Sequence, residues 1–132
     1  MSTIYKNQEN FMENECQERL KEITSKFKIC RKAISAMGDE TRQLILLTLL
    51  ESDFNGIRVG EITEKTHLSR PAVSHHLKIL KEAEIVNVRR EGTKNYYYLD
   101  PKESQWKTVT ELINLIFTGI QHIGEDDSRK GE

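Results

Sequence analysis

One helix-forming segment, residues 69–82, constrains the possible folds of this chain more than any other feature. Ser69 is a good N-cap, because its hydroxyl can accept a hydrogen bond from a free N–H of the first turn. Pro71 is tolerated in that turn, where its missing N–H costs little. Leu77 and Leu80 lie within about 40° of Val73 on the helical wheel, so these three apolar residues share one face. The pattern predicts a helix with one buried face and one polar face rich in hydrogen-bond donors.

Further secondary structure is predicted on both sides of this helix. A short helix over residues 59–66 should precede it, after a turn at Asn55 and Gly56. A β-hairpin should follow it, because residues 85–90 and 95–99 are rich in β-prone side chains and flank a turn. A helix, a short turn, a second helix and a hairpin together form a winged helix-turn-helix.

Another helix is predicted just upstream, where Gly38 ends one helix and Asp39 can cap the next. The run Leu44–Leu50 that follows is apolar on nearly all sides of a helix. We therefore expect this helix to lie in the core.

Two longer segments carry regular apolar spacings of three and four residues, which are typical of helices with an apolar seam. They are residues 16–37 and 106–123. A chain of this length cannot cover both seams by itself, so we expect a homodimer, with packing within one chain as the alternative. The expected interface residues are Leu20, Ile23, Phe27, Val109, Ile113, Ile116 and Ile120.

The length of 132 residues suits one domain. We expect a single, mainly α-helical domain over 1–132, with a small β-hairpin, long N- and C-terminal helices at the dimer interface, and frayed tails at 1–10 and 124–132. No apolar run approaches the roughly 18 residues that span a bilayer, and the first ten residues lack an apolar signal core. We therefore expect a cytoplasmic protein without membrane contact.

Local charge favours nucleic acid as the partner, although the whole chain has a formal net charge of −1. Residues 58–98 contain eight Lys or Arg against five Glu, a local excess of +3. We expect double-stranded DNA to be contacted by eight residues: Ser69, Arg70, Ser74, His75, Lys78, Arg89, Arg90 and Lys94. The first five belong to the helix that would enter the major groove, and the last three to a hairpin that would contact the backbone and minor groove. An ordinary solvated helix face is the alternative.

Two segments resemble signatures of the ArsR/SmtB family: AMGDETR at 36–42 and LSRPAVSHHLKIL at 68–80. RREG at 89–92, followed by YYYL at 96–99, resembles the wing of that family. The resemblance covers roughly residues 30–100. It implies a dimeric repressor that leaves its operator when a metal, a metalloid or another small inducer binds, although activation stays open.

Two positions depart from the family pattern, because His67 and Glu84 stand where glycine is usual. Both positions often require positive φ, which glycine adopts without a steric penalty. We expect some strain there but the same turns.

A sensor site is only weakly indicated. The Cys-x-Cys pair of the family's thiolate site is replaced by residues 58–60, which contain no cysteine. At the family's C-terminal site, Glu111, His122 and Glu125 could hold zinc across a dimer, although solvated side chains are the alternative. Cys16 and Cys30 are too far apart on one helix to pair within a chain, so only a link between subunits could join them.

Two rival functions belong to other classes. A protein-interaction adaptor is one, because winged helices can also bind proteins. An enzyme is the other, but no nucleophile elbow, phosphate loop or pair of carboxylates within a plausible cleft emerges from the sequence. We therefore expect no catalytic residues.

Overall fold

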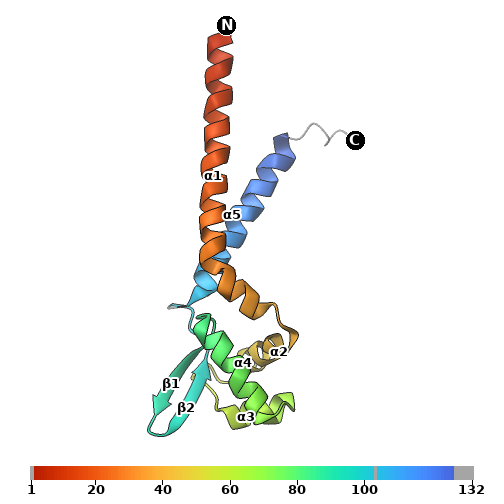
Figure 1. The fold of residues 1–132 in the computed structure, drawn as a ribbon, viewed down its shortest axis with the longest axis vertical. Coiled ribbons are helices and arrows are strands. Elements are labelled where there is room, and N and C mark those ends of the chain that lie inside the picture. Colours follow the sequence, from red (N-terminus) through yellow and green to blue (C-terminus); the bar gives the residue numbers. More distant parts are fainter. Residues whose placement is uncertain (1, 103, 127–132) are drawn as a thin grey trace. The chain divides into compact units, whose positions relative to one another are not determined.

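A computed structural model describes the backbone of residues 2–102 and 104–126, and the side chains of residues 13–102 and 104–124. The chain divides into two compact units (Figure 1). One is Cys30–Val109, and the other joins the residues up to Ile29 with those from Thr110 onward. Two long helices, α1 (Ser2–Met37) and α5 (Gln105–Asp126), contribute residues to both units.

The Cys30–Val109 unit contains the predicted elements in the predicted order. After α1 come three helices and a hairpin: α2 (Glu40–Leu50), α3 (Val59–Thr66), α4 (Arg70–Glu82), β1 (Asn87–Glu91) and β2 (Lys94–Tyr98). The strands pair antiparallel around the turn at Gly92, which has a φ of 62°. The mainly helical fold with a small hairpin is therefore confirmed.

The long helices extend further than the apolar spacings indicate. Helix α1 already begins at Ser2, so residues 2–10 are helical where the sequence predicts a frayed tail. Of the predicted C-terminal tail, residues 124–126 belong to α5. The remaining tail residues, 127–132, lie outside the described part of the chain.

Local capping explains where α2 and α4 begin. The Asp39 carboxylate accepts a hydrogen bond of 2.9 Å from the backbone N–H of Arg42. The Ser69 hydroxyl accepts one of 3.2 Å from the N–H of Ala72. Both predicted N-caps are confirmed, and each satisfies a donor that the helix itself leaves free.

The two positions that lack the family's glycine do adopt positive φ. His67 and Glu84 both have a φ of 59°, as the sequence predicts for these turns. At the end of α4, the N–H of Ile85 donates to the carbonyl of Leu80 at 3.0 Å, across the residue with positive φ. This is the hydrogen bond of a Schellman motif, and both of its side chains are fully buried.

The core of this unit lies between α2, α3 and α4, which contact one another pairwise. Its largest fully buried side chains include Ile45, Ile62, Leu77, Leu80 and Ile85. The end of α1 adds the small buried residues Cys30, Ala33 and Ala36. Small residues let a helix approach this core closely.

The expectation that α2 is buried on nearly all sides is wrong. Ile45, Leu46, Thr48 and Leu49 are buried, but Leu44, Leu47 and Leu50 are 40%, 54% and 52% exposed. Helices α3 and α4 cover one side of α2. An apolar sequence run does not reveal that the other side has no neighbour among the described residues.

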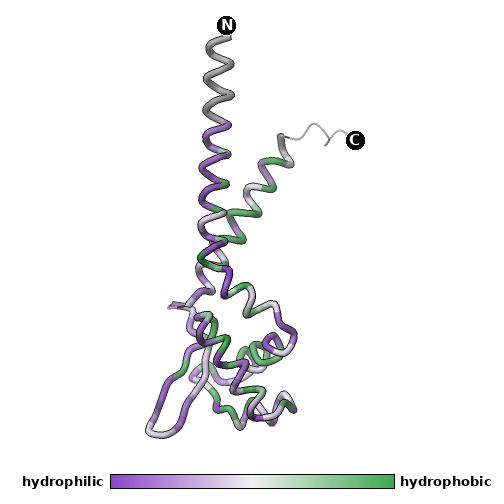
Figure 2. The backbone as a smooth tube through the Cα atoms, in the orientation of Figure 1, coloured by the Kyte–Doolittle hydropathy of each residue, from purple (hydrophilic) through white to green (hydrophobic). Residues whose placement is uncertain are grey.

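The second unit is an antiparallel pair formed by the first part of α1 and most of α5. Gly119 lies against Arg19 and Ile23, where an added Cβ would be 3.8 Å from each side chain. Nearer the start of α5, Lys26 pairs with Glu111 at 3.1 Å. Figure 2 shows hydrophobic positions recurring along α5 between hydrophilic ones. None of the helices, as far as they are described, is long and apolar enough to cross a membrane.

The cap of α2 predicts a specific pH dependence of stability. The hydrogen bond from Arg42 N–H to the Asp39 carboxylate lowers the pKa of Asp39 below its usual 3.8, because it favours the charged form. A carboxyl with a lowered folded pKa stabilises the fold above its unfolded pKa, and this contribution is lost as the pH falls through the folded pKa. Asp39→Asn keeps a capping oxygen but cannot titrate.

We therefore expect the free energy of unfolding of the unmodified chain, relative to Asp39→Asn, to fall as the pH is lowered from about 5 to about 2. Urea unfolding at stepped pH measures this difference. A difference that does not change over this range would show that the Asp39 carboxylate does not cap α2.

Candidate nucleic-acid interface

The outer face of α4 carries the predicted hydrogen-bond donors. Val73, Leu77 and Leu80 are fully buried on its inner face. The predicted contact residues of this helix are exposed on the other side: Arg70, Ser74, His75 and Lys78. Burial of one face therefore turns the donors outward, where a bound ligand can reach them.

A side-chain network ties α4 to the rest of the unit. His76, which the helical wheel places beside the apolar face, is partly buried, and its Nδ1 lies 3.4 Å from Nη1 of Arg42. Nε of Arg42 donates at 2.7 Å to the carbonyl of Ala36 near the end of α1. Arg42 thus connects the ends of α1 and α2 with the donor-bearing helix.

The wing is anchored to the loop before α3 by backbone hydrogen bonds. Ile57 and Tyr97 exchange N–H to carbonyl bonds of 3.0 and 2.8 Å, an isolated antiparallel bridge. Gly56 has a φ of +111°, and an added Cβ would lie 3.0 Å from Cβ of Tyr96. Glycine is needed at position 56 because the loop passes so close to β2.

The three basic wing residues differ in their surroundings. Arg90 and Lys94 are exposed, and Nε of Arg90 donates to the carbonyl of Gly92 at 3.0 Å. Arg89 is partly buried, and it bonds the carbonyl of Asn55 and the carboxylate of Glu91. The wing therefore presents two exposed cations, Arg90 and Lys94, and a third, Arg89, that is partly buried and bonded to two groups of its own chain.

Sequence reasoning missed the roles of Asn55, Gly56 and Tyr96. Asn55 and Gly56 are read from the sequence only as a turn, and Tyr96 only as part of a β-prone run. Arg89 and Asn55 are 34 residues apart, so no local spacing links them. A glycine next to a β-prone residue can indicate that another backbone segment passes close by. Gly56, followed by Ile57, is the sequence signal of this kind for the contact between the loop and β2.

Most of the predicted interface residues on the long helices are exposed. Leu20, Phe27, Ile113 and Ile120 are exposed, while Ile23 and Ile116 are partly buried. Val109 differs, because it is only 8% exposed and belongs to the Cys30–Val109 unit. Its place in the seam pattern does not distinguish packing within the chain from packing on a partner.

Within one chain, the two described metal candidates lie apart from each other. Glu111 pairs with Lys26, and His122 is exposed. Glu125 lies outside the described side chains. Among the described residues, no group of three or more His, Cys, Asp or Glu could hold a metal ion. Cys16 is exposed and Cys30 is buried.

Comparisons with known proteins match this arrangement. Residues 39–88 match the family model described as bacterial regulatory protein, arsR family. An uncharacterised helix-turn-helix-type transcriptional regulator of Methanocaldococcus jannaschii is 40% identical over 91 residues, 69% of this chain and 94% of that protein. The transcriptional repressor SdpR of Bacillus subtilis is 37% identical over 84 residues, 64% of this chain and 89% of that protein.

The fold also matches a solved structure. An ArsR-like transcriptional regulator from Rhodococcus sp. RHA1 aligns with a TM-score of 0.62 over 75% of this chain and 90% of that one, at 21% identity. That match supports the fold, and the two relatives above support the family. The chain therefore belongs to the ArsR/SmtB family of winged helix-turn-helix proteins, which are DNA-binding transcriptional regulators and not enzymes.

Proposed function

We propose that this chain is a homodimeric repressor that binds double-stranded operator DNA in the cytoplasm and leaves it when a small inducer binds. The observation that carries the DNA-binding part is the outer face of α4, where four donor residues are exposed while the inner face is fully buried. Repression is supported by the similarity to the repressor SdpR. Release by an inducer rests on the family resemblance. A thiolate-bound metal is not the proposed inducer, because residues 58–60 contain no cysteine where the family has its Cys-x-Cys pair.

A second copy of the chain is the proposed cover for the apolar face of the long helices. Among the described residues, seven large apolar side chains are exposed on α1 and α5 in the second unit: Leu20, Phe27, Ile29, Ile113, Phe117, Ile120 and Ile123. Such a patch marks an interaction surface on a water-soluble protein. Identical seams can pair about a two-fold axis, which is the commonest arrangement of homodimers.

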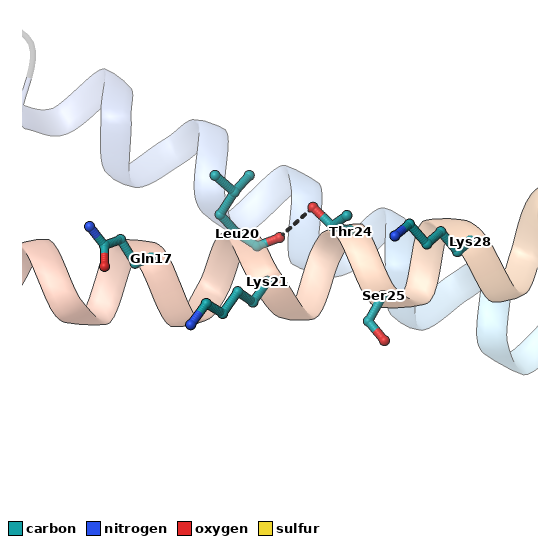
Figure 3. A pocket seen from close by; sticks show the side chains of 6 residues that line it. All are labelled: Gln17, Leu20, Lys21, Thr24, Ser25 and Lys28. Carbon is teal, nitrogen blue, oxygen red and sulfur yellow. Dashed lines mark hydrogen bonds between the residues drawn. The ribbon is translucent and has the colours of Figure 1, made fainter.

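The surface of α1 on one side of Leu20 is hollowed. A shallow hollow of about 420 Å³ is lined by six residues of α1: Gln17, Leu20, Lys21, Thr24, Ser25 and Lys28 (Figure 3). The Thr24 hydroxyl donates to the carbonyl of Leu20 at 2.8 Å. Because residues of one helix line the hollow, it is not an enclosed site for an inducer.

The dimer is tested by placing a charge in the proposed interface. We expect Ile120→Glu to weaken dimerisation at least about a hundredfold, because burying an unpaired carboxylate costs about 3 kcal/mol or more. Gln121→Glu is the matched control, since it adds the same charge at the neighbouring exposed position. Sedimentation equilibrium measures both, and an unchanged dimer in Ile120→Glu would place the interface elsewhere.

The proposed DNA contacts fall into two sets with different signatures. Arg70, Ser74, His75 and Lys78, with Ser69 at the start of the helix, would face bases and adjacent phosphates in the major groove. Arg90 and Lys94 would contact the backbone and minor groove, which adds affinity without reading sequence.

We expect Arg70→Ala to weaken operator binding by about 1–3 kcal/mol and to relax specificity, because a base contact is lost. Lys94→Ala should weaken binding to operator and to random DNA alike, because one phosphate contact is lost. The slope of log K against log salt concentration, here called the salt slope, should fall in magnitude by about 1. Fluorescence anisotropy across a salt series measures both. If Arg70→Ala affects operator and random duplexes equally, Arg70 does not read sequence.

A protein-interaction adaptor is the second candidate, and the exposed apolar side of α2 is the observation that favours it. Leu44, Leu47 and Leu50 are exposed along that helix, and Phe54 is 75% exposed just beyond it. The same binding measurements distinguish the two functions. A chain that shows no preference for any DNA sequence would favour the adaptor.

A further inference from the structure

Arg89 is held by three different groups within its own chain. Its Nη1 donates to the backbone carbonyl of Asn55, and its Nε donates to the Glu91 carboxylate at 3.1 Å. Its guanidinium carbon lies 5.0 Å from the ring centre of Tyr96, the residue directly opposite it in the hairpin. A planar guanidinium suits this combination, because it can stack on a ring while donating in its own plane.

These contacts connect two segments that the sequence places far apart. Asn55 lies in the loop between α2 and α3, whereas Arg89 and Tyr96 lie on the two strands of the wing. The bridge between Ile57 and Tyr97 joins the same loop to β2 through the backbone. Arg89, which pairs with Tyr96 next to this bridge, adds a side-chain attachment to Asn55. The wing is therefore fixed to the loop at two neighbouring points.

The Arg89 side chain makes more contacts within its own chain than the other two basic side chains of the wing do. The Lys94 side chain makes no hydrogen bond or ion pair with any described residue, and among those residues the Arg90 side chain bonds only the Gly92 carbonyl at the tip. The charge of Arg89 is partly balanced by Glu91, with which it forms an ion pair. A cation that is balanced and held in this way releases few counterions from DNA.

We propose that Arg89 is a positioning residue: it fixes the wing to the α2–α3 loop and does not itself neutralise a DNA phosphate. The wing residues that meet DNA are then Arg90 and Lys94, whose placement Arg89 sets. This inference rests on the proposed DNA binding for its functional consequence. The attachment itself can be measured without DNA.

The proposal predicts that substitutions of Arg89 lower the affinity for operator DNA without changing the salt dependence of binding. Arg89→Ala should weaken operator binding about fivefold or more, because the wing loses its fixed orientation, yet leave the salt slope unchanged. Arg89→Lys should not restore affinity, because an ammonium keeps the charge but loses the planar, stacking donor. Tyr96→Leu removes no charge and should reproduce the loss seen with Arg89→Ala.

Arg90→Ala is the matched control, and it should lower the salt slope by about 1. Anisotropy titrations of the full chain across a salt series measure every variant, with thermal unfolding to confirm that each one folds. If Arg89→Ala lowers the salt slope by about 1 and Arg89→Lys restores affinity, Arg89 contacts a phosphate and the proposal is overturned. Unchanged affinity in Arg89→Ala would equally overturn it.

Hydrogen exchange tests the attachment independently of DNA. In the free protein, Arg89→Ala should speed the exchange of the amides of Ile57 and Tyr97, which form the neighbouring bridge. Arg90→Ala should leave them unchanged. Faster exchange without sequence-specific DNA binding would support the attachment while removing the proposed function. Unchanged exchange in Arg89→Ala would overturn the attachment.

Discussion

The orientation of α4, the proposed DNA-reading helix, depends on the burial of one of its faces. Val73, Leu77 and Leu80 are fully buried, and α4 packs on α2 and α3. At about 25 cal/mol per Å² of apolar surface, each of these side chains contributes roughly 1.5–3 kcal/mol, more than any exposed polar contact of the helix. Their burial decides which way the helix faces, so the donors on the opposite side need no further device to point outward. The N-cap at Ser69 and the Schellman motif after Glu82 then fix its two ends.

The wing needs a separate constraint, because a two-stranded hairpin is only marginally stable alone in water. The bridge between Ile57 and Tyr97 supplies it, and Gly56 permits the close approach that this bridge requires. Arg42 plays a comparable part for α4, since it reaches both His76 and the carbonyl of Ala36. In each case the local sequence determines the secondary structure of the element. A contact with a distant segment then determines where that element lies.

The difference between local contacts and contacts between distant segments explains what could be predicted from the sequence. The caps at Asp39 and Ser69 and the order of elements follow from neighbouring residues, and they were predictable. The positive φ of His67 and Glu84 was predictable from the family resemblance, because glycine is usual at both positions. The exposed side of α2 was not, because apolar composition does not reveal which neighbours a helix has. The engagement of Arg89 and the ion pair of Glu111 with Lys26 were also out of reach, because their partners are 34 and 85 residues away. At the candidate interface, sequence therefore identified the donor residues of α4 but not the contacts that hold the wing.

The central claim is that two copies of α4 enter the major groove of one operator, and methylation protection tests it most directly. The operator would be a duplex selected by the full chain from random DNA. The account predicts two symmetrical half-sites, with guanine N7 atoms protected in the major groove and centres about 10–10.5 base pairs, or a multiple of that, apart. A tight complex that protects only one half-site, or leaves every major-groove guanine reactive, would contradict it.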